Sequence, residues 1–141
     1  MKWCRLVTAC AAGAGSSSLW RPPVPPSTSM DVASITALAQ AQLVAATTAE
    51  SGRSSVTVYG RPGARLRQTI VALAVGRVMG EHKSPGDASV FCLRGRVLLR
   101  AGQSHTELGQ GDLVAVPPQR HDLEALEPSV LLLTVALHSR A

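Results

Sequence analysis

Aromatic residues, cysteines and long apolar runs are all scarce in this chain of 141 residues. Aromatics make up 3% of the sequence, so it lacks the stacking platforms with which proteins bind single-stranded nucleic acid. Three cysteines without CxxC spacing give no sign of a disulfide framework or a zinc knuckle, and they favour a reducing, cytoplasmic location. No apolar run approaches the roughly 20 residues of a membrane span, so we expect no membrane partner.

Acidic residues are absent from the first thirty positions, which affects how the net charge of +5 is interpreted. That segment carries Lys2, Arg5 and Arg21, so only two of the five net charges belong to the remaining chain. A nearly neutral domain is not typical of a nucleic-acid-binding face. The one local basic cluster is Arg61, Arg65 and Arg67, which we interpret as a solvated strand face, with a phosphate contact as the alternative.

Residues 1–30 lack the features of a folded or targeting segment. The apolar stretch before Cys10 is shorter than the roughly 7 to 15 residues of a signal peptide. The following "SSSLWRPPVPPSTS" is too rich in Ser and Pro to bury a core, so we expect a disordered extension. Met30 stands just before the first helical pattern, and a start codon assigned too far upstream is our hypothesis for this extension.

What the sequence does contain is one helical pattern followed by a long alternating one. Apolar spacing predicts a helix over residues 34–49, within an N-terminal unit 31–51, with Ser34 or Asp31 as its N-cap and Gly52 as its C-terminal cap. It is weakly amphipathic, so we expect it to pack on a sheet edge or a partner subunit.

From residue 52 to 138 the apolar period is two, and Gly or Pro recurs every eight to twelve residues, which is typical of an antiparallel sandwich or barrel. There is no room for a βαβ unit, which excludes a Rossmann half. The class is therefore all-β with one N-terminal helix. The predicted strands are 54–59, 65–74, 77–83, 88–93, 96–101, 105–108, 112–116, 121–126 and 130–137.

Residues 76–121 resemble the two motifs of the cupin superfamily. In the first motif Gly76, His82 and Gly95 are in register, but Ser84 occupies the second histidine position and Ala88 the glutamate position. In the second motif Gly111 and Pro117 match, while His121 comes one residue early. The resemblance extends from Gly52 to Leu137 and implies a cupin-like double-sheet jelly-roll barrel.

The resemblance also implies a divalent metal inside the barrel, held here by His82 and His121. Serine is a poor ligand and alanine is none, so full ligation would need Glu81, Asp87 or His105 turned inward by a bulge. We therefore expect a tight metal site to be absent. His105 and His138 are interpreted as surface residues.

Strand alternation predicts which side chains face the interior. It places Val78, Gly80, His82 and Ser84 on one face of their strand, and His121, Leu123 and Ala125 on one face of another. Both histidines are thus predicted to point inward, as the polar floor of an otherwise apolar pocket. Cys92 is also interpreted as a small core residue. The predicted pocket residues are His82, Ser84, Val90, Cys92, His121 and Leu123.

The leading functional hypothesis is a non-catalytic small-molecule-binding or regulatory module, motivated by the missing ligand positions. No recognition helix follows the single helix, so direct nucleic-acid binding is not expected. The alternative is a metal-dependent oxygenase or isomerase that uses His82 and His121. A third hypothesis is an assembly role, in which "SVLLLTVAL" or the helix pairs across a homodimer.

Overall fold

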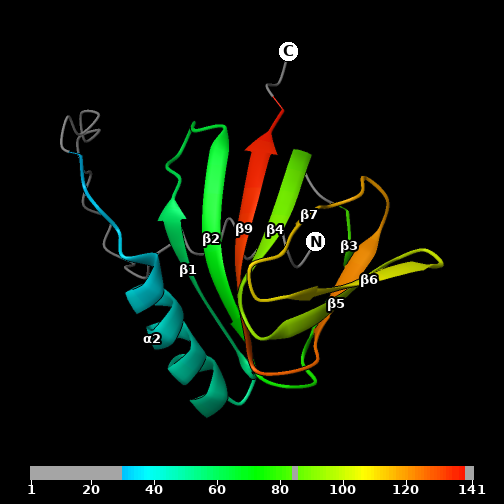
Figure 1. Ribbon diagram of the computed structural model, residues 1–141. Helices are drawn as coiled ribbons and strands as arrows, with labels where there is room; N and C mark the ends of the chain where they lie inside the picture. Colours follow the sequence, from blue (N-terminus) through cyan, green and yellow to red (C-terminus); the bar gives the residue numbers. More distant parts are fainter. Residues whose placement is uncertain (1–29, 84–85, 139–141) are drawn as a thin grey trace.

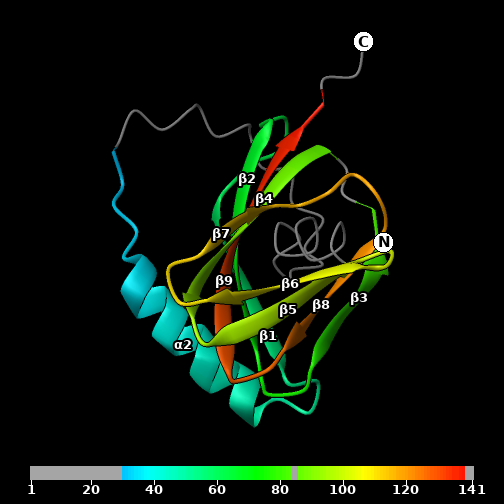
Figure 2. The same cartoon turned by 45° about the vertical axis from the view of Figure 1, so that its right-hand side comes forward.

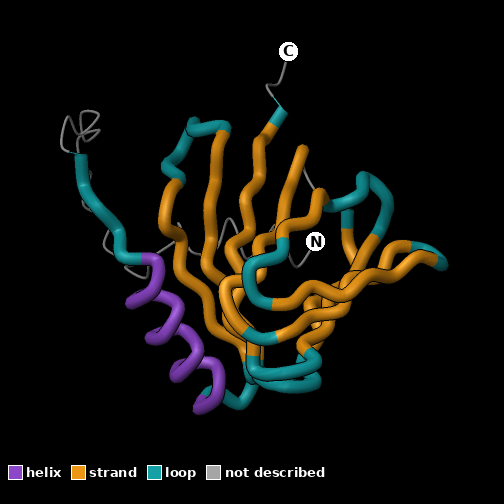
Figure 3. Tube along the Cα trace, in the orientation of Figure 1, coloured by secondary structure: helices purple, strands orange, loops and turns teal. Residues whose placement is uncertain are grey.

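The computed structural model of the protein describes residues 30–83 and 86–138, and at Glu81 and His82 it describes the backbone. The predicted extension therefore lies outside the described residues except for Met30, and so does Ser84. Within the described residues the chain forms one helix followed by nine strands, in close agreement with the predicted ranges (Figure 3).

Helix α2 spans Ile35–Thr48 and begins at the predicted N-cap. Ser34 Oγ accepts a hydrogen bond from the backbone N–H of Ala37 at 3.2 Å, which satisfies one of the unpaired donors of the first turn. The helix ends at Ala49, and Gly52 turns the chain three residues later with a φ of 65°. The prediction of Gly52 as the cap was therefore wrong, because Ala49 ends the helix in an extended conformation.

The strands form two antiparallel sheets that face each other (Figures 1 and 2). Sheet A has the order β1-β2-β9-β4-β7 and sheet B the order β3-β8-β5-β6. This arrangement confirms the predicted double-sheet jelly roll. The strands are β1 (Arg53–Tyr59), β2 (Leu66–Leu73), β3 (Val78–His82), β4 (Gly86–Arg94), β5 (Arg96–Ala101), β6 (Ser104–Gly109), β7 (Leu113–Ala115), β8 (His121–Ala125) and β9 (Ser129–Leu137).

Two apolar clusters hold these layers together. The outer cluster joins α2 to the outside of sheet A (Figure 1). There Ala46 is fully buried among Ile70, Ala72 and Val130. The inner cluster lies between the sheets. It comprises Val71, Leu73, Met79, Val90, Cys92, Val97, Leu99, Leu108, Leu123, Ala125, Leu131, Leu133 and Val135. Since α2 covers one face of β2 and sheet B faces the other, β2 is buried on both faces from Thr69 to Leu73.

A bulge in β3 changes the predicted inward face of that strand. Met79 is 1% exposed and joins the inner cluster, whereas Val78 is 39% exposed, so the predicted placement of Val78 was wrong. The register then shifts between Met79 and His82, and His82 becomes the Cα partner of His121. An inserted residue reverses the alternation on one side of a bulge, which a period-two pattern cannot anticipate.

The segment "SVLLLTVAL" forms β9, the central strand of sheet A. It pairs with β2 on one side and with β4 on the other. Both backbone edges of this strand are therefore occupied within the chain, and it cannot pair across a homodimer.

Candidate functional site

We call the end of the barrel at which β8 begins the His121 end. Antiparallel pairing brings the last residues of β1, β3 and β9 to this end, together with the first residues of β2, β4 and β8. The opposite end contains Leu73, Ala125 and Ser129, which are all fully buried. The hydroxyl of Ser129 at that opposite end accepts a hydrogen bond from the backbone N–H of Arg96.

His121 is 1% exposed and shares the inward face of β8 with Leu123 and Ala125, which confirms its predicted orientation. Its Nδ1 lies 2.9 Å from the backbone oxygen of Gln119. A carbonyl oxygen only accepts, so Nδ1 donates the hydrogen of this bond. This bond fixes the orientation of the imidazole.

The other predicted pocket residues differ in where they lie. The backbone register places His82 directly across from His121. Val90, Cys92 and Leu123 are at most 1% exposed and belong to the packed inner cluster. Burial raises the pKa of the Cys92 thiol, whose sulfur lies 3.4 Å from the carbonyl oxygen of Arg94. Cys92 is thus a core residue with little thiolate character.

The described residues do not supply a metal site. Among them no group of three His, Cys, Asp or Glu side chains converges. Ala88, at the glutamate position of the cupin motif, packs against the inner cluster. Asp87 and His105 are exposed, so neither is turned inward as full ligation would require. Of the two histidines that the resemblance assigns to a metal, the structure describes the side chain of His121.

Two threonines that the sequence did not reveal lie on the interior face of sheet A. Thr57 of β1 and Thr69 of β2 are Cα partners, and Thr69 shares its face with Val71 and Leu73 of the inner cluster. Thr69 is 0% exposed. Within the described residues, neither buried Oγ1 atom has a hydrogen-bond partner. Threonine is common in strands, so no sequence signal distinguished these two.

Arg67 was assigned to a solvated strand face, and this was wrong. It precedes Thr69 by two residues on β2, so both share the interior face, and its Nε is inaccessible to solvent. Arg61 and Arg65, in the turn before β2, are exposed as predicted. The difference arises because Arg67 lies on the interior face of β2, where it is partly buried, and a cluster of arginines in a sequence does not indicate this.

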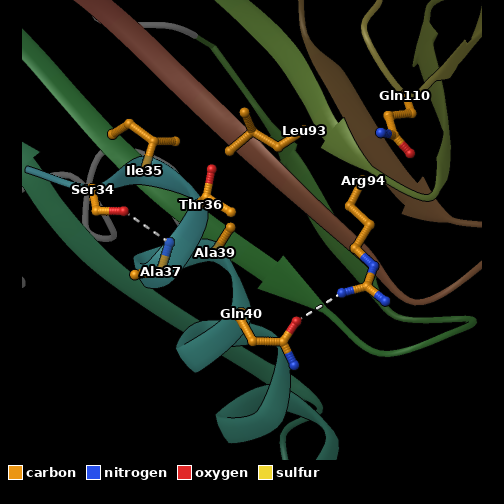
Figure 4. Close-up of a pocket in the computed structure, with 9 residues that line it drawn as sticks. All are labelled: Ser34, Ile35, Thr36, Ala37, Ala39, Gln40, Leu93, Arg94 and Gln110. Carbon is orange, nitrogen blue, oxygen red and sulfur yellow. Dashed lines mark hydrogen bonds between the residues drawn. The ribbon is translucent and has the colours of Figure 1, made fainter.

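A groove of about 620 Å³ lies outside the barrel, between the first turns of α2 and the end of β4 (Figure 4). Arg94 crosses it and donates a hydrogen bond from its guanidinium to Gln40 Oε1 at 2.8 Å. None of the six pocket residues predicted from the sequence lines this groove. Its lining is Ser34, Ile35, Thr36, Ala37, Ala39, Gln40, Leu93, Arg94 and Gln110.

The outer face of sheet B carries a separate charged network. Arg100 donates to Asp122 at 2.8 Å and to Glu124 at 2.9 Å. These two hydrogen bonds outweigh partial burial and raise the pKa of Arg100, with the bond to Asp122 as the largest cause. All three side chains are partly exposed, so the network is a surface feature.

Comparison with known proteins gives structural relatives only. No family model and no curated protein matches the sequence. A conserved Streptococcus pyogenes protein of unknown function has 29% identity and a TM-score of 0.59, over 65% of this chain and 80% of that one.

Two further solved structures carry more informative names. A cupin superfamily protein from Desulfitobacterium hafniense has 17% identity and a TM-score of 0.57, over 61% of this chain and 78% of that one. KdgF from Halomonas has 22% identity and a TM-score of 0.55, over 64% and 84%. The chain therefore has the cupin fold. In the described part of the chain, no helix has the length and apolar character to cross a membrane.

Proposed function

We propose that this small single-domain protein of cupin fold is a non-catalytic module that binds a small molecule at the His121 end of its barrel. The observation that carries the proposal is the pair of interior hydroxyls on Thr57 and Thr69, which have no hydrogen-bond partner among the described residues. A buried polar group without a partner costs about 1 to 3 kcal/mol. A ligand that hydrogen-bonds to both hydroxyls would offset that cost.

The positions of the two hydroxyls suit a single ligand group. Side chains of directly opposed residues in an antiparallel pair have Cβ atoms roughly 4.5 to 5.5 Å apart, so one polar group can contact both. Each hydroxyl can donate and accept. The same interior face presents Val71 and Leu133, so the remainder of the ligand would meet an apolar wall.

The same environment argues against covalent catalysis by these threonines. A nucleophilic hydroxyl needs a neighbouring base to take its proton. Among the described residues no base lies within hydrogen-bonding distance of either Oγ1. The arrangement therefore supports recognition of a ligand.

The test is a ligand-detected NMR screen of small polar compounds against the protein and its variants. Thr57→Val/Thr69→Val removes both hydroxyls and keeps β-branched side chains of the same size. Thr134→Val is the matched control, because Thr134 lies on the outer face of sheet A and accepts a bond from Gln68. We expect binders of the parent that also bind the control and bind the double variant at least about tenfold more weakly, from the loss of two hydrogen bonds. Equal binding to the double variant would refute the proposal.

A metal-dependent oxygenase or isomerase is the second candidate, and the pairing of His82 with His121 favours it. Metal-binding histidines commonly donate their other ring N–H to a backbone carbonyl, as His121 does to Gln119. Elemental analysis of untagged protein purified without chelators tests this candidate. Near-stoichiometric metal that is lost in His82→Ala/His121→Ala would favour the enzyme, whereas folded protein without metal would leave the binding module.

A further inference from the structure

Positive charge is concentrated at the His121 end of the barrel. The strand order brings the turn between β1 and β2, the end of β3 and the start of β8 to this end. Two acidic residues, Glu81 and Asp87, occupy positions on the strands that reach this end. Asp122 also lies near it, but its carboxylate accepts a hydrogen bond from Arg100 on the outside of sheet B. The cationic residues here are Arg61, Arg65, Arg67, Lys83 and Arg120.

We call the exposed cations Arg61, Arg65, Lys83 and Arg120 the basic rim. Arg67 lies between this rim and the interior hydroxyls of Thr57 and Thr69. A Cβ atom built on Gly60 would lie 3.3 Å from Arg67 Cγ and 3.6 Å from Thr57 Cγ2, so both side chains flank the same point of the β1–β2 turn. Thr69 follows on the same face of β2. A guanidinium has five N–H donors in a planar arrangement that suits an oxyanion.

We infer that the small molecule carries an oxyanion, a carboxylate or a phosphate, which Arg67 holds beside the hydroxyls of Thr57 and Thr69. This inference rests on the proposed binding function and adds the chemical class of the ligand. Arginine forms paired, charge-assisted hydrogen bonds with such groups, and hydroxyls complete their coordination. The exposed cations of the rim raise the local concentration of anions and speed their entry.

A small anion fits these features better than a nucleic acid. Arg67 and both hydroxyls lie on the interior face of sheet A, where a duplex cannot reach. No described residue on that face offers an aromatic platform for bases: Tyr59 is 52% exposed, and Phe91 points outward beside Leu113.

The experiment is a protein-detected NMR titration with matched anionic and neutral probes. The pairs are succinate with succinamide and benzoate with benzamide, and inorganic phosphate is added alone. The variants are Arg67→Gln, Arg65→Gln on the rim, and Arg53→Gln at the opposite end of β1 as the control. Titrations at about 20 and 300 mM NaCl bracket the screening length of roughly 8 Å at physiological salt.

We expect at least one anion to shift the amides of β1, β2 and β8, with a dissociation constant about tenfold lower than that of its neutral partner. Arg67→Gln should weaken this binding at least tenfold. Arg65→Gln should weaken it about two- to threefold and flatten its salt dependence, which keeps the test valid if Arg67→Gln fails to fold. Arg53→Gln should leave it unchanged.

Each other outcome overturns a defined claim. If amides bind as tightly as their acids, the oxyanion inference is wrong and the binding function stands. If no probe of either class binds and the compound screen also gives no binder, both the oxyanion inference and the proposed binding function are wrong. If a short DNA duplex binds and displaces the small anions, the basic rim serves a nucleic acid and the inference is wrong.

Discussion

Replacement of Thr69 by valine is the sharpest stability test of the interior hydroxyls. Thr69 is 0% exposed and its Oγ1 has no partner among the described residues, so the change removes a desolvated polar atom and breaks no described hydrogen bond. Valine keeps the β-branch and the size of the side chain, so strand propensity is preserved. The new methyl group faces the inner cluster beside Leu133, its cross-strand partner.

The size of the effect follows from the cost of an unpaired buried group. That cost is about 1 to 3 kcal/mol, and partial hydration in solution favours the lower end. We expect Thr69→Val to raise the free energy of unfolding of the unliganded protein by about 1 kcal/mol, and its Tm by roughly 4 °C. Thr134→Val removes the acceptor of Gln68 and should lower the stability by about 0.5 kcal/mol.

Urea denaturation, analysed with a shared m-value, gives the change in the free energy of unfolding for Thr69→Val and for Thr134→Val. A gain in stability at Thr69 combined with weaker ligand binding is the expected signature of a residue kept for recognition. A loss of about 1 kcal/mol or more would mean that the hydroxyl is well bonded inside the folded protein. The reasoning behind the proposed site would then be refuted.

Two further predictions concern the core and a turn. Because burial raises the pKa of Cys92, its thiol should be alkylated at pH 8 at least about tenfold more slowly in the folded protein than in the urea-unfolded protein. Mass spectrometry of the Cys92 peptide would measure both rates. The stability that the buried thiol contributes is full below the pKa of Cys92 in the unfolded protein, and it falls as the pH rises through the pKa in the folded protein. Rapid alkylation would contradict its burial. Gly95→Ala should lower the free energy of unfolding by about 3 kcal/mol, because φ is +84° and the new Cβ would lie 2.4 Å from the Pro128 oxygen and the Ser129 hydroxyl. Gly63→Ala, with φ +85° and open space, should cost only about 1 kcal/mol, and equal losses would contradict the crowding at Gly95.

The strands could be predicted from the sequence because glycine and proline mark nearly every turn between them. The inward orientation of His121 could also be predicted from the sequence, since buried and partly buried residues alternate regularly along β8. Which residues of β3 face the interior could not be predicted, because a bulge between Met79 and His82 inserts a residue that the apolar pattern does not reveal.

The site residues of sheet A were hidden for a different reason. A strand buried on both faces carries polar residues without the usual alternation, so Arg67 resembled its exposed neighbour Arg65. Thr57 and Thr69 became recognisable only when the pairing of β1 with β2 placed them side by side. Such pairs depend on register across a turn, which composition and periodicity do not determine.

The most direct test of the account is where a bound ligand lies on the protein. The measurement is an amide chemical-shift map of the tightest-binding compound from the screen on isotope-labelled protein. The account predicts that the largest shifts fall on Thr57, Arg67, Thr69 and His121 at one end of the barrel. Shifts confined to Ile35–Gln40, Leu93 and Arg94 would place the ligand in the outer groove and contradict the central claim.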